Sequence, residues 1–203
     1  MITTSKIKTT GLQIIFVSSV IFGAASCNHK DSEHKTSSTS VTEDLAKDQN
    51  DEKFNKIKDE KNAQFLVKVA KINLEEISLG ELAQKKSKRT SVKNLGKMME
   101  TAHAKAMGNL EELAGKKTIS VPTEQDQDAK DTYAKLNGKT EKDFDKAYAD
   151  MMVDGHKHAI ALFEKESVES SDEDIRIWAT SMLPDLRKHL DHAIVVQKEC
   201  EKL

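Results

Sequence analysis

The sequence has few of the residues that interrupt helices or mark strands. It contains two prolines and eight glycines in 203 residues, and no run of alternating β-branched residues indicates a strand. A third of the residues are charged, which suits helices whose outer faces are solvated. These shortages predict an all-α protein.

Cysteines are few as well, and the net charge is small. Cys27 and Cys200 are the two cysteines, and if Cys27 is modified no structural disulfide is expected. The formal net charge is −2, without a basic stripe, which argues against a nucleic-acid partner. There is also no glycine-rich phosphate loop, zinc-type cysteine pair or His-Glu-x-x-His helix motif. Binding of nucleic acid, binding of phosphate by such a loop and these two kinds of zinc site are thereby disfavoured.

The first 26 residues predict a secretion signal. Lys6 and Lys8 form a basic segment, residues 12–25 form an apolar one, and small residues precede Cys27. This order is typical of a bacterial lipoprotein signal, and the apolar segment is shorter than the about 20 residues of a membrane span. We therefore expect an exported protein that is lipidated at Cys27. It would be anchored in the cell envelope, at the periplasmic or outer face of the outer membrane. A retained N-terminal anchor is the alternative.

The rest of the chain divides into a polar segment and a periodic one. Residues 27–60 hold many Ser, Thr, Asp and Lys residues and few apolar ones, which predicts a flexible tether. Residues 61–203 carry apolar residues in steps of three and four, which predicts four long helices. A connection of roughly 25 residues, with a short helix at residues 123–136, separates the second from the third. Two hairpins joined in this way predict a ferritin-like four-helix bundle.

Each long helix also carries one polar residue on its apolar face. Glu76 lies in series with Ile72 and Leu79 in the first helix. His103, His156 and His189 take the corresponding places in the second, third and fourth helices. Inward polar groups are costly unless they are paired, so these four residues form the candidate site.

Several segments resemble a known family, the bacterial domain-of-unknown-function 4142 family. They are Asn62 to Leu66, Glu76 to Ala83, Phe144 to Tyr148, His156 to Phe163 and Leu183 to Leu190. The resemblance implies an exported, ferritin-like protein without a settled activity. The polar landmarks of the family map onto Glu76, His103, His156 and His189. Ala102 departs from the pattern, because family members commonly have Asp directly before the histidine of the second helix.

Two hypotheses account for the inward polar residues. In the first they bind one zinc, iron or copper ion, since imidazole and carboxylate suit such borderline metals; the carboxylates are too few for a di-iron centre. In the second they form a metal-free hydrogen-bond network in which Glu76 is ionised and one or two histidines are protonated. Counting residues from the expected turns places Glu76, His103 and His156 in one layer. His189 is displaced by one to two turns and serves as fourth ligand or as a supporting group.

The sequence names no catalytic residue. It favours a non-enzymatic role, as a lipid-anchored binding or stress-related module of the envelope whose protein partner is unknown. The alternative is a metal-binding ferritin-like protein, either a metal-dependent oxidase or a metal store, that uses the Glu/His cluster.

Overall fold

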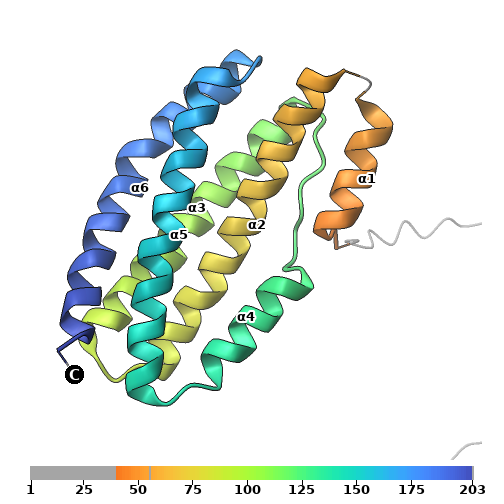
Figure 1. The fold of residues 1–203 in the computed structure, drawn as a ribbon. Coiled ribbons are helices and arrows are strands. Elements are labelled where there is room, and N and C mark those ends of the chain that lie inside the picture. Colours follow the sequence, from red (N-terminus) through yellow and green to blue (C-terminus); the bar gives the residue numbers. More distant parts are fainter. Residues whose placement is uncertain (1–39, 55, 203) are drawn as a thin grey trace, which may run out of the picture. The chain divides into compact units, whose positions relative to one another are not determined.

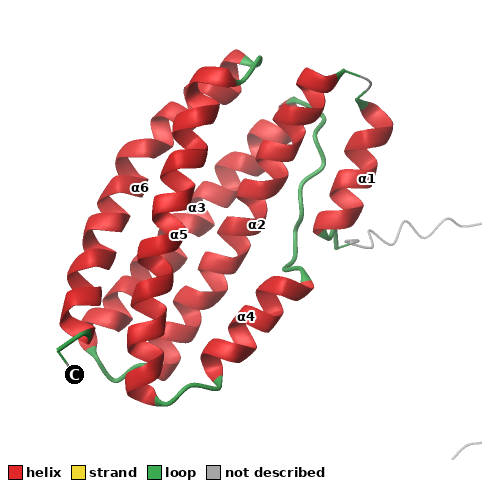
Figure 2. Cartoon of the chain, viewed as in Figure 1, coloured by secondary structure: helices red, strands yellow, loops and turns green. Residues whose placement is uncertain are grey.

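The computed structural model describes residues 40–54 and 56–202, and within these ranges the chain forms six helices and no strand (Figures 1 and 2). They are α1 Glu43–Lys53, α2 Ile57–Lys86, α3 Thr90–Lys116, α4 Gln127–Asn137, α5 Glu141–Glu169 and α6 Glu173–Cys200. The all-α expectation is confirmed. None of the helices in the described ranges has both the length and the apolar character of a membrane span. The expected signal segment and Cys27 lie outside these ranges.

Local signals set the ends of the long helices. Asp172 caps α6, because its side chain accepts a hydrogen bond from the Ile175 amide at 3.2 Å, and the acids that follow suit the positive end of the helix dipole. Thr140 directly precedes α5, and its hydroxyl donates to the Asp143 carboxylate at 2.7 Å instead of accepting from the backbone. A side-chain pair therefore marks the start of this helix.

The four long helices pack as two antiparallel hairpins, α2 with α3 and α5 with α6 (Figure 1). The first hairpin is unusually close at Gly80 and Gly96, where the two backbones touch. A Cβ atom added at Gly80 would lie 2.6 Å from the Gly96 carbonyl oxygen. These two glycines therefore determine how near α2 and α3 approach each other.

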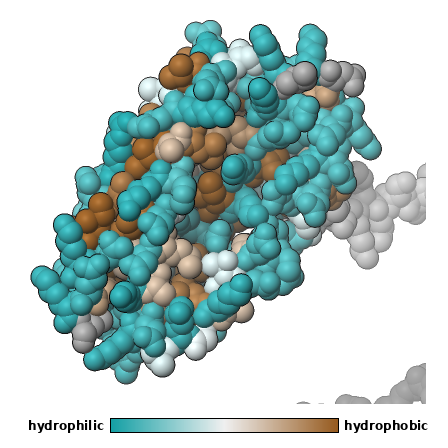
Figure 3. Space-filling model, in the orientation of Figure 1, coloured by the Kyte–Doolittle hydropathy of each residue, from teal (hydrophilic) through white to brown (hydrophobic). Residues whose placement is uncertain are grey.

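The apolar core between the hairpins consists of two clusters. One contains Phe65 and Phe163, packed edge to face at 5.4 Å between ring centroids, with Trp178 beside them. The other contains Phe144 and Tyr148, whose stacked rings are 6.0 Å apart. The inward histidines belong to neither cluster, and they lie between the two along the helices. On the face shown in Figure 3, hydrophilic residues cover most of the surface and hydrophobic ones gather in a band that runs diagonally across it.

The expected tether of residues 27–60 is too long, because its last part folds as α1. Ala46 and Asn50 of this helix are buried. The Asn50 amide donates to the Ser120 carbonyl oxygen and accepts from the Ser120 amide, both at 2.8 Å. Composition did not reveal this helix because α1 is held by hydrogen bonds and one small apolar residue, not by a large apolar face. The folded region therefore begins before residue 61.

The connection between α3 and α5 carries α4, whose start also differs from expectation. Asp126 caps this helix by accepting from the Ala129 amide at 2.8 Å, so α4 begins at Gln127 and not at Thr123. The Lys71 ammonium lies 2.6 Å from Asp126 and 3.1 Å from Glu43. One lysine of α2 thus ties both short helices to the long ones.

Candidate metal centre

Three histidines meet in the middle of the core. His103 of α3, His156 of α5 and His189 of α6 are 4%, 1% and 8% exposed. Their ring centroids lie 5.5 to 5.8 Å apart, and one nitrogen from each ring lies within 4.8 Å of the other two. The structure thus brings together three potential ligands from three helices.

The outer nitrogens of two of these rings are fixed by neighbouring acceptors. His103 Nδ1 donates to Asn73 Oδ1 at 2.8 Å, and His156 Nδ1 donates to the Met152 carbonyl oxygen at 2.9 Å. Because Nδ1 carries the proton in both rings, each Nε2 keeps a free lone pair. A hydrogen bond on the outer nitrogen is also how metal-bound histidines are usually oriented.

The remaining nitrogens have no partner. His103 Nε2, His156 Nε2 and His189 Nδ1 are all buried without a hydrogen bond in the described part of the chain. A buried polar atom without a partner destabilises a fold by about 1–3 kcal/mol. Three such atoms at one point indicate that something else satisfies them.

The electrostatics of the cluster favours neutral imidazoles. Burial lowers the pKa of His103 well below its ordinary value, and charge on His156 or His189 would lower it further. Burial lowers the pKa of His156 to about 4 and also lowers the pKa of His189. These directions oppose the network hypothesis with protonated histidines, and neutral imidazole is the form that binds metal.

Glu76 lies beside this cluster and not within it. Its Oε1 atom is 3.9 Å from His156 Nδ1, the nitrogen that already donates to Met152, and its Oε2 atom is buried without a partner. Burial, followed by the nearby charge of Glu75, raises the pKa of Glu76 to about 8. The carboxylate fits because Gly155 faces it, where a Cβ atom would lie 3.3 Å from Oε1.

The grouping of ligands therefore differs from the expected one. We expected Glu76, His103 and His156 in one layer with His189 displaced, whereas His189 completes the group and Glu76 lies beside it. The turn between α5 and α6 spans residues 170–172. His156 and His189 lie at similar distances from this turn along their helices.

Asn73 is the residue of the site that sequence analysis did not single out. It is buried. Lys88 lies in the α2–α3 turn, and Asn73 and His103 are equally far from it along the chain, one before the turn and one after it. Asn73 therefore lies opposite His103. The spacing of Leu66, Val69 and Asn73 by three and four was the signal that could have identified it.

Other polar residues near these histidines in the sequence are not part of the cluster. Glu100 accepts a hydrogen bond from Gln84 at 2.7 Å. Asp185 is exposed and lies at the edge of a small cavity beside the cluster. His158 and His192 are exposed as well. No second group of metal ligands is found among the described residues, so the site has the donors for one ion.

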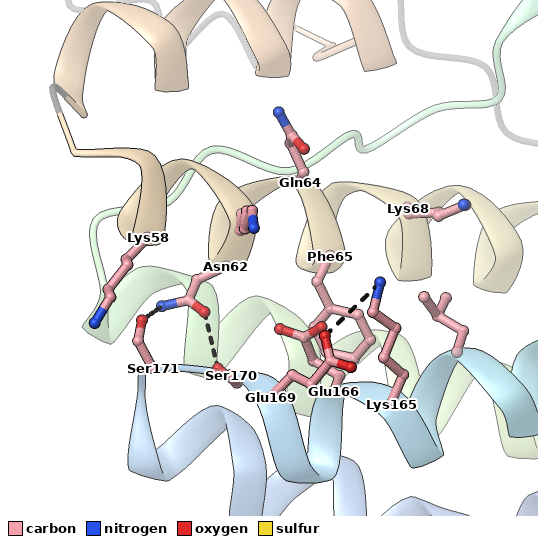
Figure 4. Close-up of a pocket in the computed structure, with 12 residues that line it drawn as sticks. Lys58, Asn62, Gln64, Phe65, Lys68, Lys165, Glu166, Glu169, Ser170 and Ser171 are labelled. Carbon is pink, nitrogen blue, oxygen red and sulfur yellow. Dashed lines mark hydrogen bonds and ion pairs between the residues drawn. The ribbon is translucent and has the colours of Figure 1, made fainter.

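A larger cavity, of about 490 Å³, opens between α2 and α5 (Figure 4). Lysines surround it, and its inner wall is formed by Asn62, which donates to Ser171 and accepts from Ser170 at 3.0 and 2.8 Å. In the described ranges, none of the buried side-chain atoms without partners belongs to this cavity. The buried polar groups of Asn62 and Ser170 are thus satisfied, and the histidine cluster is the stronger candidate.

Comparison with known proteins identifies a family but no function. Residues 45–196 match the family model described as "Domain of unknown function (DUF4142)". No curated protein and no solved structure matches the chain.

Proposed function

The chain belongs to the domain-of-unknown-function 4142 family, and we propose from the site geometry that its folded region binds one transition-metal ion. The ligands are His103, His156 and His189, and Glu76 lies next to them. The observation that carries the proposal is the convergence of three buried ring nitrogens without partners.

The donor set indicates which ions fit. Three neutral imidazoles suit zinc, copper or iron in preference to magnesium or calcium. Bonds of about 2.1 Å to one ion hold two nitrogens about 3.4 Å apart in a tetrahedral site, and here the nitrogens lie up to 4.8 Å apart. The rings therefore have to move inward by about 1 Å, which is within reach of small side-chain rotations.

A metal-free network is a poorer explanation of the same geometry. His103 and His156 direct their protons outward, to Asn73 and Met152. His189 can then donate one inward proton to one of the two remaining lone pairs. At least one buried acceptor stays unsatisfied, which destabilises the fold by about 1–3 kcal/mol. An ion satisfies all three nitrogens at once.

We further propose that the fold is a ferritin-like four-helix bundle held at the envelope membrane by a lipid on Cys27. The packing of two helical hairpins supports the first part, and the N-terminal sequence pattern supports the second. Labelled palmitate should enter the wild-type chain and not the Cys27→Ala variant. Equal labelling of the two chains would remove the lipid anchor.

The test of the metal site compares two histidines of one helix. Untagged protein purified without chelators should carry about one zinc, copper or iron ion per chain by elemental analysis. His156→Asn should weaken binding of that ion by about 100-fold in calorimetric titration, whereas His158→Asn, at an exposed position, should leave it unchanged. Equal affinities in the two variants, or no binding tighter than about 10 μM in the wild type, would refute the proposal.

A further inference from the structure

A small cavity touches the histidine cluster on one side. Its volume is about 20 Å³, and all four long helices contribute to its walls. His103 and His189 line it together with Asn73, and the remaining walls are mainly apolar, formed by residues such as Val69, Ala159 and Phe163.

The cavity and Glu76 lie on opposite sides of the histidines. On α5, Ala159 and Phe163 of the cavity wall follow His156, whereas Gly155, which faces the Glu76 carboxylate, precedes it. On α2 the order is reversed, as expected for an antiparallel helix, with Val69 before Glu76. An ion among the three histidines therefore has a carboxylate on one side and a cavity on the other.

The size and chemistry of the cavity restrict what it accepts. A volume of about 15 Å³ is enough for one water molecule, so 20 Å³ accommodates a molecule of one or two non-hydrogen atoms. A buried water needs two to four polar partners. Once the histidine nitrogens hold an ion, the buried polar atom left without a partner in this wall is Asn73 Nδ2. The cavity therefore suits a small, weakly hydrated molecule better than water.

Two residues of the cavity wall reach the surface. Asp185 is exposed, and Ala102 on the facing helix α3 is half-buried. A small molecule would therefore enter on this side, between α3 and α6.

We infer that the ion held by the three histidines keeps one coordination position open to this cavity and binds there a neutral diatomic molecule such as dioxygen or nitric oxide. This inference rests on the proposed metal site. Three protein ligands with one free position are typical of reactive metal sites, whereas structural sites are closed by four. The folded region would accordingly act on, or sense, a small gas-like ligand.

The experiment uses the full chain loaded with Co(II), whose visible spectrum responds to changes in coordination. Nitric oxide should change this spectrum in the wild type, whereas imidazole, whose ring exceeds the cavity, should not. Ala159→Val fills part of the cavity and should weaken the response to nitric oxide by about tenfold or more while Co(II) remains bound. Ala147→Val, on the same helix but away from the cavity, is the matched control and should behave as the wild type.

A second variant, which enlarges the cavity, keeps the test valid if Ala159→Val does not fold. Leu186→Ala widens the cavity and should allow imidazole to change the spectrum. If Co(II) binds to the wild type and nitric oxide leaves the spectrum unchanged, the open position is refuted and the metal site stands. If imidazole acts on the wild type as readily as nitric oxide, the cavity does not select the ligand and the inference fails. If Co(II) does not bind at all, the metal site fails with it.

Discussion

Replacing Glu76 by Gln should change how the stability of the metal-free protein depends on pH. Burial and the neighbouring Glu75 raise the pKa of Glu76 from an ordinary value of 4.5 to about 8 in the folded chain. Between these two values the folded state holds a proton that the unfolded state has lost. The free energy of unfolding therefore falls as the pH rises through this window. Gln keeps the shape of the side chain and stays neutral throughout.

The magnitude follows from the width of the window. Each pH unit in which one state holds one extra proton changes the free energy of unfolding by about 1.36 kcal/mol. From pH 6 to the folded pKa of about 8, this amounts to roughly 3 kcal/mol. The wild type should lose about that much more stability than Glu76→Gln when the pH rises from 6 to 9. The low pKa values of the histidines affect both proteins alike and cancel in the comparison.

Urea unfolding followed by circular dichroism, in the presence of a chelator, measures this difference at several pH values. Glu111→Gln removes an exposed carboxylate from α3 and serves as the control, with a profile parallel to that of the wild type. If Glu76→Gln also runs parallel to the wild type, the Glu76 carboxyl is not buried and neutral at pH 6. The description of Glu76 as a buried carboxyl with a raised pKa would then be wrong.

Three other outcomes are expected. Asn73→Ala should weaken zinc binding about 10- to 100-fold in calorimetric titration, because it removes the acceptor that orients His103; an unchanged affinity would contradict this orienting role. Gly80→Ala should destabilise the fold by about 2–3 kcal/mol, since the new methyl group overlaps the backbone of α3. Gly108→Ala, which meets no atom within 4 Å, should stabilise it by about 0.5–1 kcal/mol in the same urea assay, and similar effects of the two changes would refute the close approach. Lys71→Met should weaken the attachment of α1 by about 1 kcal/mol and speed hydrogen exchange of its amides about fivefold; unchanged exchange would show that the ion pairs do not hold this helix.

The positions of the helices and the inward direction of the histidines follow from local rules. The 3.6-residue period places His103, His156 and His189 on apolar faces whatever the helices pack against, and all three are buried. Capping residues such as Asp172 begin helices through bonds within their own first turn. These features are determined by residues only a few positions apart in the chain.

Contacts between distant segments decided the rest. The axial position of one helix against another depends on the length of the turn and on side-chain packing. The position of His189 along the bundle, and that of Glu76 beside the cluster, were therefore seen only in the tertiary structure. Asn73 became part of the site through its bond to His103 from another helix. The docking of α1 depends on Ser120, 70 residues away from Asn50. A sequence pattern records which face of a helix is buried, whereas the partners on that face are chosen by packing.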